Sequence, residues 1–421
     1  MRVLYLHQYF ATPDMAGGTR SYEMARRLVE HGHEVDLLTS DQRPTHDGSL
    51  WRQTNESGVR VHWTSMPYDN RMSFRERLRT FMAFGYRASR KVLEFRPDVV
   101  FATSTPLTIA IPAIVAQRRF GVPMVFEVRD VWPAVPIALG ALQNPLARKA
   151  ALELERQAYR HATRIVALAP GMKAHVVGTG VPAERVDVIP NGCDLDIFTN
   201  DPRAGQEIRA ANPWLADRPL VLFTGTLGAA NGLEHLVRVA AKVHERAPQV
   251  CFAIIGDGRQ REPLVALARE LGVLDVNLFV LGKMPKREVA RWVSAADITT
   301  AYFSGPPILW KDAVQNKFFD SLAAGKPVAS NHRGWQSELA LEAGCGLVMD
   351  PDDVELAAAQ LLEVVLDRSW LDRAGAAARK LGETRFSRDM LGGLLDGTLR
   401  RAVDEYAMPR APVWLPRRSI P

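Results

Sequence analysis

The sequence alternates between short apolar segments and amphipathic segments, and this alternation occurs twice along the chain. It restarts after a turn at Pro190-Asn191-Gly192, near the middle. Strands that alternate with helices form parallel sheets covered by helices on both faces. The predicted strands are Arg2–Leu6, Glu34–Leu38, Val61–Trp63, Val99–Ala102, Met124–Val128, Ile165–Leu168, Val186–Ile189, Leu220–Phe223, Cys251–Ile255, Asn277–Leu281, Ile298–Tyr302 and Val328–Ser330. We therefore predict an α/β protein with two doubly wound, Rossmann-like domains.

The length of the chain also fits two domains, because 421 residues are too many for one ordinary core. We place the first domain at residues 1–192 and the second at residues 193–386. A last helix, at residues 387–406, is expected to return to the first domain. Residues 407–421 are rich in proline and are expected to be irregular.

Composition excludes several classes of protein. The 3 cysteines are far apart, which disfavours a structural zinc site and fits a reducing compartment. No apolar run reaches the ~18 residues needed to cross a bilayer, and the N-terminus lacks a signal-peptide pattern. The net charge of +6 suits an anionic partner, but no nucleic-acid-binding motif is present. We expect a cytoplasmic protein that binds no nucleic acid.

Two aspartates in the second half of the chain, Asp312 and Asp320, are separated by seven residues, and Lys317 lies between them. Asp320 is predicted to open a helix that stops at Gly325. A carboxylate there can accept hydrogen bonds from sugar hydroxyls, while a helix N-terminus and a lysine attract a phosphate. On spacing alone, a surface helix with capping charges explains the pattern as well.

Glycines and charged residues follow several predicted strands. Gly17 and Gly18 lie between the first strand and a helix predicted at Thr19–Glu30, where they would let a phosphate approach the backbone together with Arg20. Ligands bind beyond the carboxyl ends of strands in open α/β sheets. Simple turns, caps and salt bridges remain the alternatives at each place. The other strand-end candidates are Arg129, Asp130, Gly225, Asn231, Gly256, Gly258, Lys283 and Met284.

Asp194-Leu195-Asp196 imitates the Asp-x-Asp metal motif of some sugar transferases. It lies on the turn between the domains rather than at a strand end, and no second carboxylate cluster supports it. We therefore expect no metal.

Residues 71–96 form a basic segment with apolar residues at helical spacing. Phe74 and Phe81 are predicted on one face, and Arg75 and Arg79 contribute to the positive charge. A basic amphipathic helix with aromatic residues suits an anionic membrane surface. The alternative is a helix whose apolar face packs on the domain core.

Taken in order, these motifs resemble those of family 4 glycosyltransferases with the GT-B fold, in which two Rossmann-like domains face each other across a cleft and a C-terminal helix returns to the first. Within that family the chain is most similar to bacterial transferases of surface-polysaccharide assembly, including N-acetyl-fucosamine transferases. The matching segments are HQYFATPDMAGGTRSYEMARRL, FEVRDVWP, VIPNGCDLDIF, FTGTLGAANGLEHL, IIGDGRQREPL and NKFFDSLAAGKPV.

The resemblance implies roles for three carboxylates. Asp320 would hold the ribose hydroxyls of the donor, and Asp312 would lie near the transferred sugar. The family has Glu at both positions, so each carboxylate here is one methylene shorter. Asp130 lies at the first-domain strand end where many members carry a histidine, and we expect it to act in catalysis with Asp312.

The family also places Arg and Lys in the loop after the first strand of the second domain, where they clamp the diphosphate. Here that loop, Gly225–Gly232, contains neither. We hypothesise that Lys317, with Lys311, supplies the positive charge instead. The resemblance assigns the rest of the donor site to Gly225, Asn231, Gly256, Gly258, Lys283 and Met284, and the phosphate or acceptor loop to Gly17, Gly18, Arg20 and Arg129.

The implied reaction is a retaining transfer, without metal or cofactor, from a nucleoside diphosphate sugar, with a UDP-linked N-acetyl sugar as the expected donor. If the basic helix binds the cytoplasmic face of the inner membrane, the acceptor is a polyprenyl-diphosphate-linked saccharide used in O-antigen, capsule or exopolysaccharide synthesis. Two alternatives stay open. One is a nucleotide-sugar 2-epimerase of the same fold, and the other is a non-catalytic GT-B partner subunit whose donor site has decayed.

Overall fold

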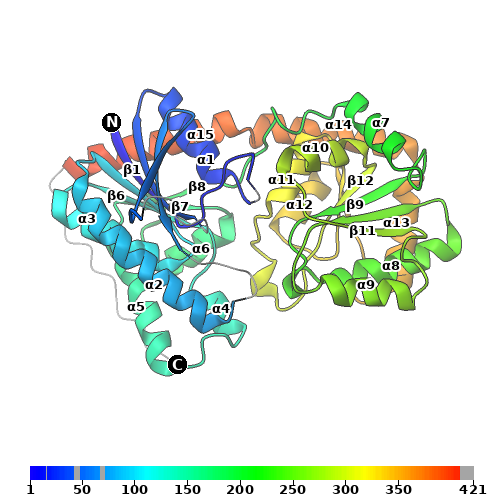
Figure 1. Ribbon diagram of the computed structural model, residues 1–421, viewed down its shortest axis with the longest axis horizontal. Coiled ribbons are helices and arrows are strands. Elements are labelled where there is room, and N and C mark those ends of the chain that lie inside the picture. The colour runs from blue at the N-terminus through cyan, green and yellow to red at the C-terminus, as the bar shows by residue number, and fades with distance from the viewer. Residues whose placement is uncertain (16, 42–47, 67–71, 408–421) are drawn as a thin grey trace. The chain divides into compact units, whose positions relative to one another are not determined.

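The computed structural model describes residues 1–15, 17–41, 48–66 and 72–407, and the predicted irregular tail lies almost entirely outside them. The chain divides into two compact units (Figure 1). Unit 1 comprises Met1–Thr12, Gly17–Pro190 and the chain from Asp389 onward. Unit 2 comprises Asn191–Arg388 and a short segment that begins at Pro13.

Unit 1 contains an eight-stranded sheet with the order β3-β4-β2-β1-β5-β6-β7-β8. Its strands are β1 (Arg2–Leu6), β2 (Glu34–Asp41), β3 (Arg52–Glu56), β4 (Val59–Ser65), β5 (Val99–Thr103), β6 (Met124–Val128), β7 (Arg164–Ala167) and β8 (Val186–Val188). Strands β5 and β6 are buried at every position, as expected of parallel strands covered on both faces.

The edge strand β3 is the one departure from a parallel sheet, because it pairs antiparallel with β4. The sequence did not predict β3, since its residues, RQTNE, are polar and lack the apolar alternation of a strand. It is held by its partner instead: the indole N–H of Trp63 donates to the Thr54 hydroxyl at 2.8 Å.

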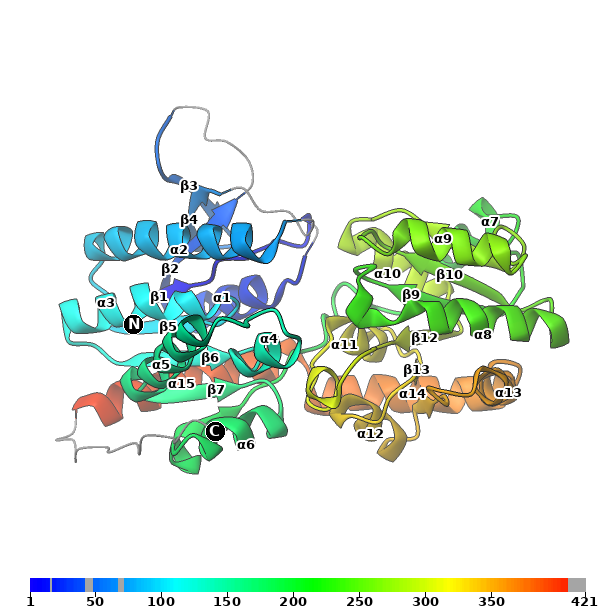
Figure 2. The ribbon, with the colours of Figure 1, turned by 90° about the horizontal axis from the view of Figure 1, so that it is seen from below.

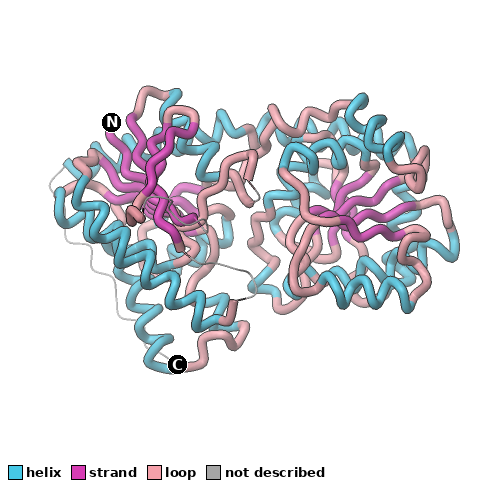
Figure 3. The backbone as a smooth tube through the Cα atoms, viewed as in Figure 1, coloured by secondary structure: helices cyan, strands magenta, loops and turns pink. Residues whose placement is uncertain are grey.

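Helices surround the strands of unit 1 (Figure 3). They are α1 (Arg20–Glu30), α2 (Phe74–Lys91), α3 (Ala110–Phe120), α4 (Ala134–Ala138), α5 (Pro145–His161), α6 (Pro170–Gly178) and α15 (Arg388–Ala407), and short 3-10 turns lie at Val92–Glu94, Leu107–Ile109 and Ala183–Arg185.

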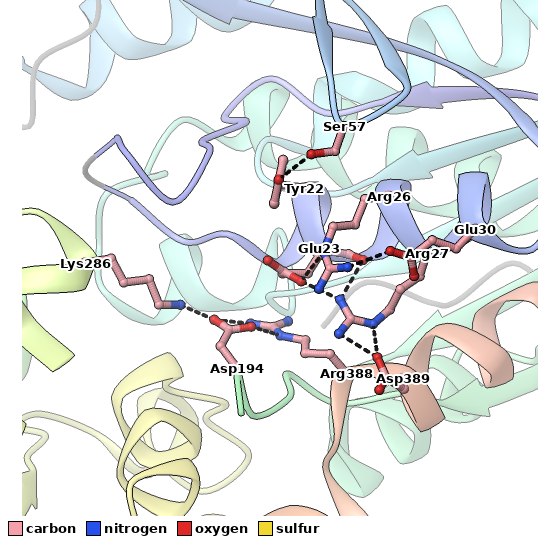
Figure 4. Close-up of polar contacts among 10 residues, drawn as sticks. All are labelled: Tyr22, Glu23, Arg26, Arg27, Glu30, Ser57, Asp194, Lys286, Arg388 and Asp389. Atoms are coloured by element: carbon pink, nitrogen blue, oxygen red, sulfur yellow. Dashed lines mark hydrogen bonds and ion pairs between the residues drawn. The ribbon is translucent and has the colours of Figure 1, made fainter. Parts of the chain in front are cut away.

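The C-terminal helix α15 is fastened to unit 1 along its length (Figure 2). Asp389 accepts from Arg27 at 2.8 Å, Asp396 pairs with His33 at 2.6 Å, and Glu405 accepts from Arg164 at 2.6 Å. The first of these contacts, which also includes Glu23 of α1, is drawn in Figure 4. The predicted return of the last helix to the first domain is confirmed.

Unit 2 contains a six-stranded parallel sheet with the order β11-β10-β9-β12-β13-β14. Its strands are β9 (Leu220–Thr224), β10 (Cys251–Ile255), β11 (Leu278–Leu281), β12 (Ile298–Ala301), β13 (Val328–Ser330) and β14 (Gly346–Val348). Its helices are α7 (Pro202–Ala211), α8 (Leu233–Arg246), α9 (Arg261–Glu270), α10 (Lys286–Ala295), α11 (Asn316–Ala323), α12 (Trp335–Glu342), α13 (Val354–Val365) and α14 (Arg368–Arg385), with 3-10 turns at Ala229–Asn231 and Pro307–Leu309.

Two hydrophobic cores lie on the two faces of this sheet, as the doubly wound prediction requires. One is built with α8, α9 and α13, and the other with α10, α11, α12 and α14. Figure 1 shows α8 and α9 on one side of the sheet and α10 on the other. Because all six strands run in parallel, their carboxyl ends and the loops that follow lie along one edge.

Candidate active site

Helix α11 begins at Asn316, four residues earlier than predicted. Asp320 therefore does not open the helix, as we expected, but lies in its second turn, and Lys317 lies in the first. The helix starts early because Gln315 is fixed by Gln336: the Gln315 N–H donates to Gln336 Oε1 at 2.9 Å, and Gln336 Nε2 donates to the Gln315 carbonyl at 3.1 Å. The predicted stop is confirmed, because Gly325 follows the helix with a left-handed φ of 62°.

Lys317 lies at the end of β9. Its ammonium nitrogen is 3.7 Å from the centroid of the Phe223 ring. A Cβ atom at Gly225, where φ is 137°, would lie 3.3 Å from Cε and Nζ of this lysine. Burial lowers the pKa of Lys317 to about 7. Because Lys317 lies in the first turn of a helix and beside a glycine loop, an anion there would be attracted both by the lysine and by the helix N-terminus.

Asp320 faces a cluster of charges rather than open solvent. Its side chain is 17% exposed, and Oδ1 lies 3.5 Å from the ammonium of Lys286. Among the residues that the structure describes, none donates a hydrogen bond of ordinary geometry to this oxygen. Burial raises the pKa of Asp320 to about 6, against the opposing effect of Lys286.

Lys286 and Arg388 also share Asp194 (Figure 4). Arg388 Nε donates to Asp194 Oδ1 at 2.6 Å, and Lys286 Nζ donates to Asp194 Oδ2. Although burial alone would raise it, the pKa of Asp194 is lowered by these two cations. The Asp-x-Asp pattern thus contributes a buried ion-pair partner.

Asp312 lies in the loop before α11 and is half-buried. Burial raises the pKa of its carboxyl group, and the exposed Lys311 beside it opposes that change. Asp312 and Lys311 thus belong to the same short segment of the chain as Lys317 and Asp320.

Gly256 and Gly258 are required by the packing of two strand-end loops. A Cβ atom at Gly256 would lie 1.8 Å from the carbonyl oxygen of Gly225, and one at Gly258 would lie 2.3 Å from that of Leu227. The Leu227 N–H also donates to the Asp257 carbonyl at 2.9 Å. The space at these glycines is thus filled by the neighbouring loop, which holds Gly225 in place beside Lys317.

The other residues assigned to the donor site occupy loops at the same edge of the sheet. Asn231 donates to the Thr226 carbonyl at 2.8 Å and so braces the Gly225–Gly232 loop. Lys283 is exposed after β11, and Met284 packs partly against the core. Of these, Lys283 is free to reach a ligand without a change of packing.

In unit 1, Arg20 is a buried structural residue rather than part of a phosphate loop. It is completely buried, and its guanidinium donates to Glu127 Oε1 at 2.7 Å and to the Ile189 carbonyl at 2.8 Å. It also donates to the Pro190 carbonyl, and Glu127 accepts from Thr103. The ligand role predicted for Arg20 is wrong because all of its donors face inward.

The exposed group at this edge of unit 1 is Asp130, which follows β6 and accepts from the Thr105 hydroxyl at 2.9 Å. Arg129 is half-buried, and its guanidinium lies 3.4 Å from His7 Nε2. His7 was not among the predicted site residues, although it directly follows the first strand. Burial and the nearby arginines hold the pKa of His7 well below its usual value.

Gly17 and Gly18 are exposed in the loop before α1. Gly17 has a φ of 149°, which favours glycine, and a Cβ atom there would lie 3.1 Å from that of Ala11. The described part of this loop thus supports a tight turn.

Helix α2 presents a different face from the one predicted. Phe81 is 7% exposed and packs inward, so it cannot contact a membrane, and the side chain of Phe74 lies outside the described residues. Arg75 and Arg79 are exposed, as expected. They border an exposed apolar stripe that consists of Leu78 (39% exposed), Met82 (50%) and Tyr86 (65%).

Within the described residues, no group of three or more His, Cys, Asp or Glu side chains is arranged to hold a metal ion. In the same part of the chain, none of the helices combines the length and apolar character that crossing a bilayer requires.

Comparison with known proteins matches residues 16–192 to the glycosyl transferase 4-like domain and residues 205–381 to the group 1 glycosyl transferases. D-inositol 3-phosphate glycosyltransferase of Thermobispora bispora is 28% identical, over 86% of this chain and 85% of its own. The GDP-mannose-dependent alpha-(1-6)-phosphatidylinositol monomannoside mannosyltransferase of Mycolicibacterium smegmatis is 28% identical over 47% of this chain and 52% of its own.

Among solved structures, HepE of Anabaena in complex with UDP-glucose has a TM-score of 0.71 at 17% identity, covering 95% of this chain and 100% of its own. A likeness at this identity concerns the fold, and it confirms the GT-B fold class with two Rossmann-like domains. The two family models together span most of the sequence, and they match the two units in chain order. The chain belongs to glycosyltransferase family 4, a family of GT-B enzymes that use nucleotide sugars.

Proposed function

We propose that this glycosyltransferase moves a sugar, with retention and without a metal ion, from a UDP-linked donor, expected to be an N-acetyl sugar, to a lipid-linked saccharide. The observation that carries the proposal is the pairing of Lys317 and Asp320 on α11 at the end of β9. A cation at the start of a helix and a carboxylate one turn later suit a ligand that carries both phosphates and hydroxyls.

In this proposal the diphosphate lies against the first turn of α11. Negative charge grows on the phosphates as the bond to the sugar breaks, and the Lys317 ammonium and the helix N–H groups stabilise it. A phosphate nearby favours the charged form of Lys317, so binding of the donor would be accompanied by uptake of a proton from solvent at this lysine. Asp320 would accept hydrogen bonds from the ribose hydroxyls.

Asp312 would lie near the transferred sugar, and Asp130 is proposed for the acceptor side. Burial raises the pKa of the Asp312 carboxyl group above its ordinary value, which favours a role for this residue in proton transfer. Asp130 is exposed, with one oxygen held by Thr105, so its second oxygen remains available to an incoming hydroxyl.

The acceptor is proposed to be membrane-bound, in the assembly of a surface polysaccharide such as O-antigen, capsule or exopolysaccharide. Support comes from the exposed stripe of Leu78, Met82 and Tyr86 beside Arg75 and Arg79. Apolar side chains can enter the lipid interface while arginines bind anionic headgroups. A polyprenyl-diphosphate-linked saccharide at the cytoplasmic face of the inner membrane fits this surface. The phosphatidylinositol-linked acceptor in the name of the mycolicibacterial relative is also a lipid.

A donor and acceptor screen tests the proposal. The protein is incubated with UDP-N-acetylglucosamine, UDP-glucose or GDP-mannose, each with and without a polyprenyl-diphosphate-linked monosaccharide. Release of nucleotide and the mass of the glycolipid are measured. We expect acceptor-dependent release of UDP that is lost in Asp320→Ala. If GDP-mannose were the one donor of the three that is used, the choice of nucleotide would be overturned. Epimerisation of UDP-N-acetylglucosamine in the absence of acceptor would overturn the transfer reaction.

A further inference from the structure

The donor-site carboxylate is not isolated, because Asp320 shares the ammonium of Lys286 with Asp194. Nζ of Lys286 lies 3.5 Å from Asp320 Oδ1 and donates to Asp194 Oδ2. These side chains come from three places in the sequence: Asp320 from α11, Lys286 from the first position of α10, and Asp194 from the segment after β8. The side chain of Lys286 is only 11% exposed.

Lys286 is fixed on its far side. Asp194 also accepts from Arg388 at 2.6 Å, and the Cys193 N–H donates to the Phe386 carbonyl at 2.7 Å. The two segments that make these contacts lie close to points where the chain passes between the units, at Pro190–Asn191 and at Arg388–Asp389. The ammonium is therefore held by Asp194, which Arg388 holds in turn, so that one buried ion-pair cluster fixes the cation beside Asp320.

We propose that Lys286 is a positioning residue of the donor site: it keeps the Asp320 carboxylate ionised and oriented to accept hydrogen bonds from the donor. This inference rests on the proposed function. Without a cation nearby, a carboxyl group this deeply placed is neutral at cellular pH and loses part of its capacity to accept. A nearby cation matters more for aspartate than for glutamate, because the aspartate carboxylate lies closer to the backbone.

Charged groups of both signs act on Asp320. Lys286 and Arg388 favour its ionised form, whereas burial and Asp194 oppose it. The thiol of Cys193 also lies within electrostatic range of Asp320, and burial raises its pKa, so that it remains neutral. Lys286 and Asp194 therefore act on Asp320 with opposite sign, although they belong to one ion-pair cluster.

This opposition gives a test that separates electrostatics from structure. Binding of UDP-N-acetylglucosamine is measured by calorimetry from pH 5.0 to 8.5 for the wild-type chain, Lys286→Met, Lys286→Arg, Asp194→Asn and the exposed control Lys380→Met. This donor carries no phosphate proton that titrates in the range. In the wild-type chain we expect affinity to fall below about pH 6, where Asp320 gains a proton.

The pH below which donor affinity falls should rise by about one unit or more in Lys286→Met. The loss of affinity relative to the wild-type chain is then about tenfold near pH 6 and shrinks by pH 8. Lys286→Arg should keep the pH of this fall at its wild-type value. Asp194→Asn should lower that pH, and Lys380→Met should leave it unchanged. Circular dichroism and thermal melting confirm that each variant is folded at the pH of measurement.

Two results would overturn the positioning role and leave the proposed function standing. One is a loss of affinity in Lys286→Met that is the same at every pH. The other is a shift in the pH of the fall that has the same direction in Lys286→Met and in Asp194→Asn. Wild-type protein that binds none of the UDP-sugar at any pH would overturn the proposed function itself. The two failures are thus distinguishable in one data set.

Discussion

The ammonium of Lys317 lies 3.7 Å from the centroid of the Phe223 ring, at the point where β9 ends and α11 begins. The aromatic face partly compensates the burial of this charge. It does not do so fully, because the pKa of Lys317 remains lowered to about 7. A lysine that is costly to keep charged in the free protein is suited to a ligand that brings negative charge.

Replacing Lys317 by methionine should stabilise the free protein in a pH-dependent way. Its pKa is about 7 in the folded chain against an ordinary value of 10.5, so folding releases a proton between these values and stability rises with pH across that window. Lys317→Met should raise the free energy of unfolding by about 1–2 kcal/mol at pH 6, and the gain should shrink towards pH 10. Thermal melting at pH 6, 8 and 10 checks this, and a gain independent of pH would contradict it.

The Arg20–Glu127 ion pair should be essential for unit 1. Both side chains are completely buried, and Arg20 also holds the carbonyls of Ile189 and Pro190. Arg20→Met removes the cation that pairs with the buried carboxylate of Glu127, which should cost about 3–5 kcal/mol. The exposed Arg119→Met on α3 is the matched control. Urea unfolding measures both, and an Arg20→Met protein as stable as the control would restore the phosphate-binding role that the structure argues against.

Much of the fold could be predicted because buried parallel strands have a recognisable apolar pattern in the sequence. Strand β10 is a continuous apolar run followed by glycine, and β6 is apolar except for Glu127 and is followed by charged residues; both were found. The polar edge strand β3 gave no such signal, and its existence depends on pairing with β4. Local pattern cannot reveal a strand that is stabilised by its neighbour alone.

The candidate site was predicted in part, for a similar reason. Lys317 was found from its spacing to Asp312 and Asp320, because all three lie on one short segment. Lys286 was missed because it reaches Asp320 from another helix, and no sequence spacing reports that approach. Arg20 was misassigned because a charged residue after a glycine pair looks the same in sequence whether it faces a ligand or a buried carboxylate.

The packing of the two glycine loops in unit 2 should tolerate no side chain at Gly256. A Cβ atom there would lie 1.8 Å from the Gly225 carbonyl oxygen, and φ is 157°. Gly256→Ala should therefore destabilise unit 2 by about 3 kcal/mol. At Gly282 a Cβ atom would meet nothing within 4 Å, so Gly282→Ala is the control and should change stability by less than about 1 kcal/mol. Equal melting temperatures for the two variants would show that the loops can separate without cost.

The exposed stripe on α2 should determine membrane binding. Replacing Leu78, Met82 and Tyr86 together by serine should weaken binding to vesicles that contain anionic phospholipid by about tenfold or more. Leu356→Ser, an exposed leucine on α13, should have no effect. Co-sedimentation at low and high salt measures both, and high salt should weaken the wild-type protein because Arg75 and Arg79 bind headgroups. Unchanged binding in the triple variant would remove α2 as the docking surface.

The central claim is that Lys317 and Asp320 together bind the nucleotide sugar. The most direct measurement is calorimetric titration of UDP-N-acetylglucosamine at pH 6.5 into the wild-type chain, Lys317→Met, Asp320→Ala and the control Lys380→Met. We predict that Lys317→Met and Asp320→Ala each lose about tenfold or more in affinity, because each removes a charge-assisted contact with the donor, while Lys380→Met binds as the wild type does. Equal affinity in all four proteins would contradict the account.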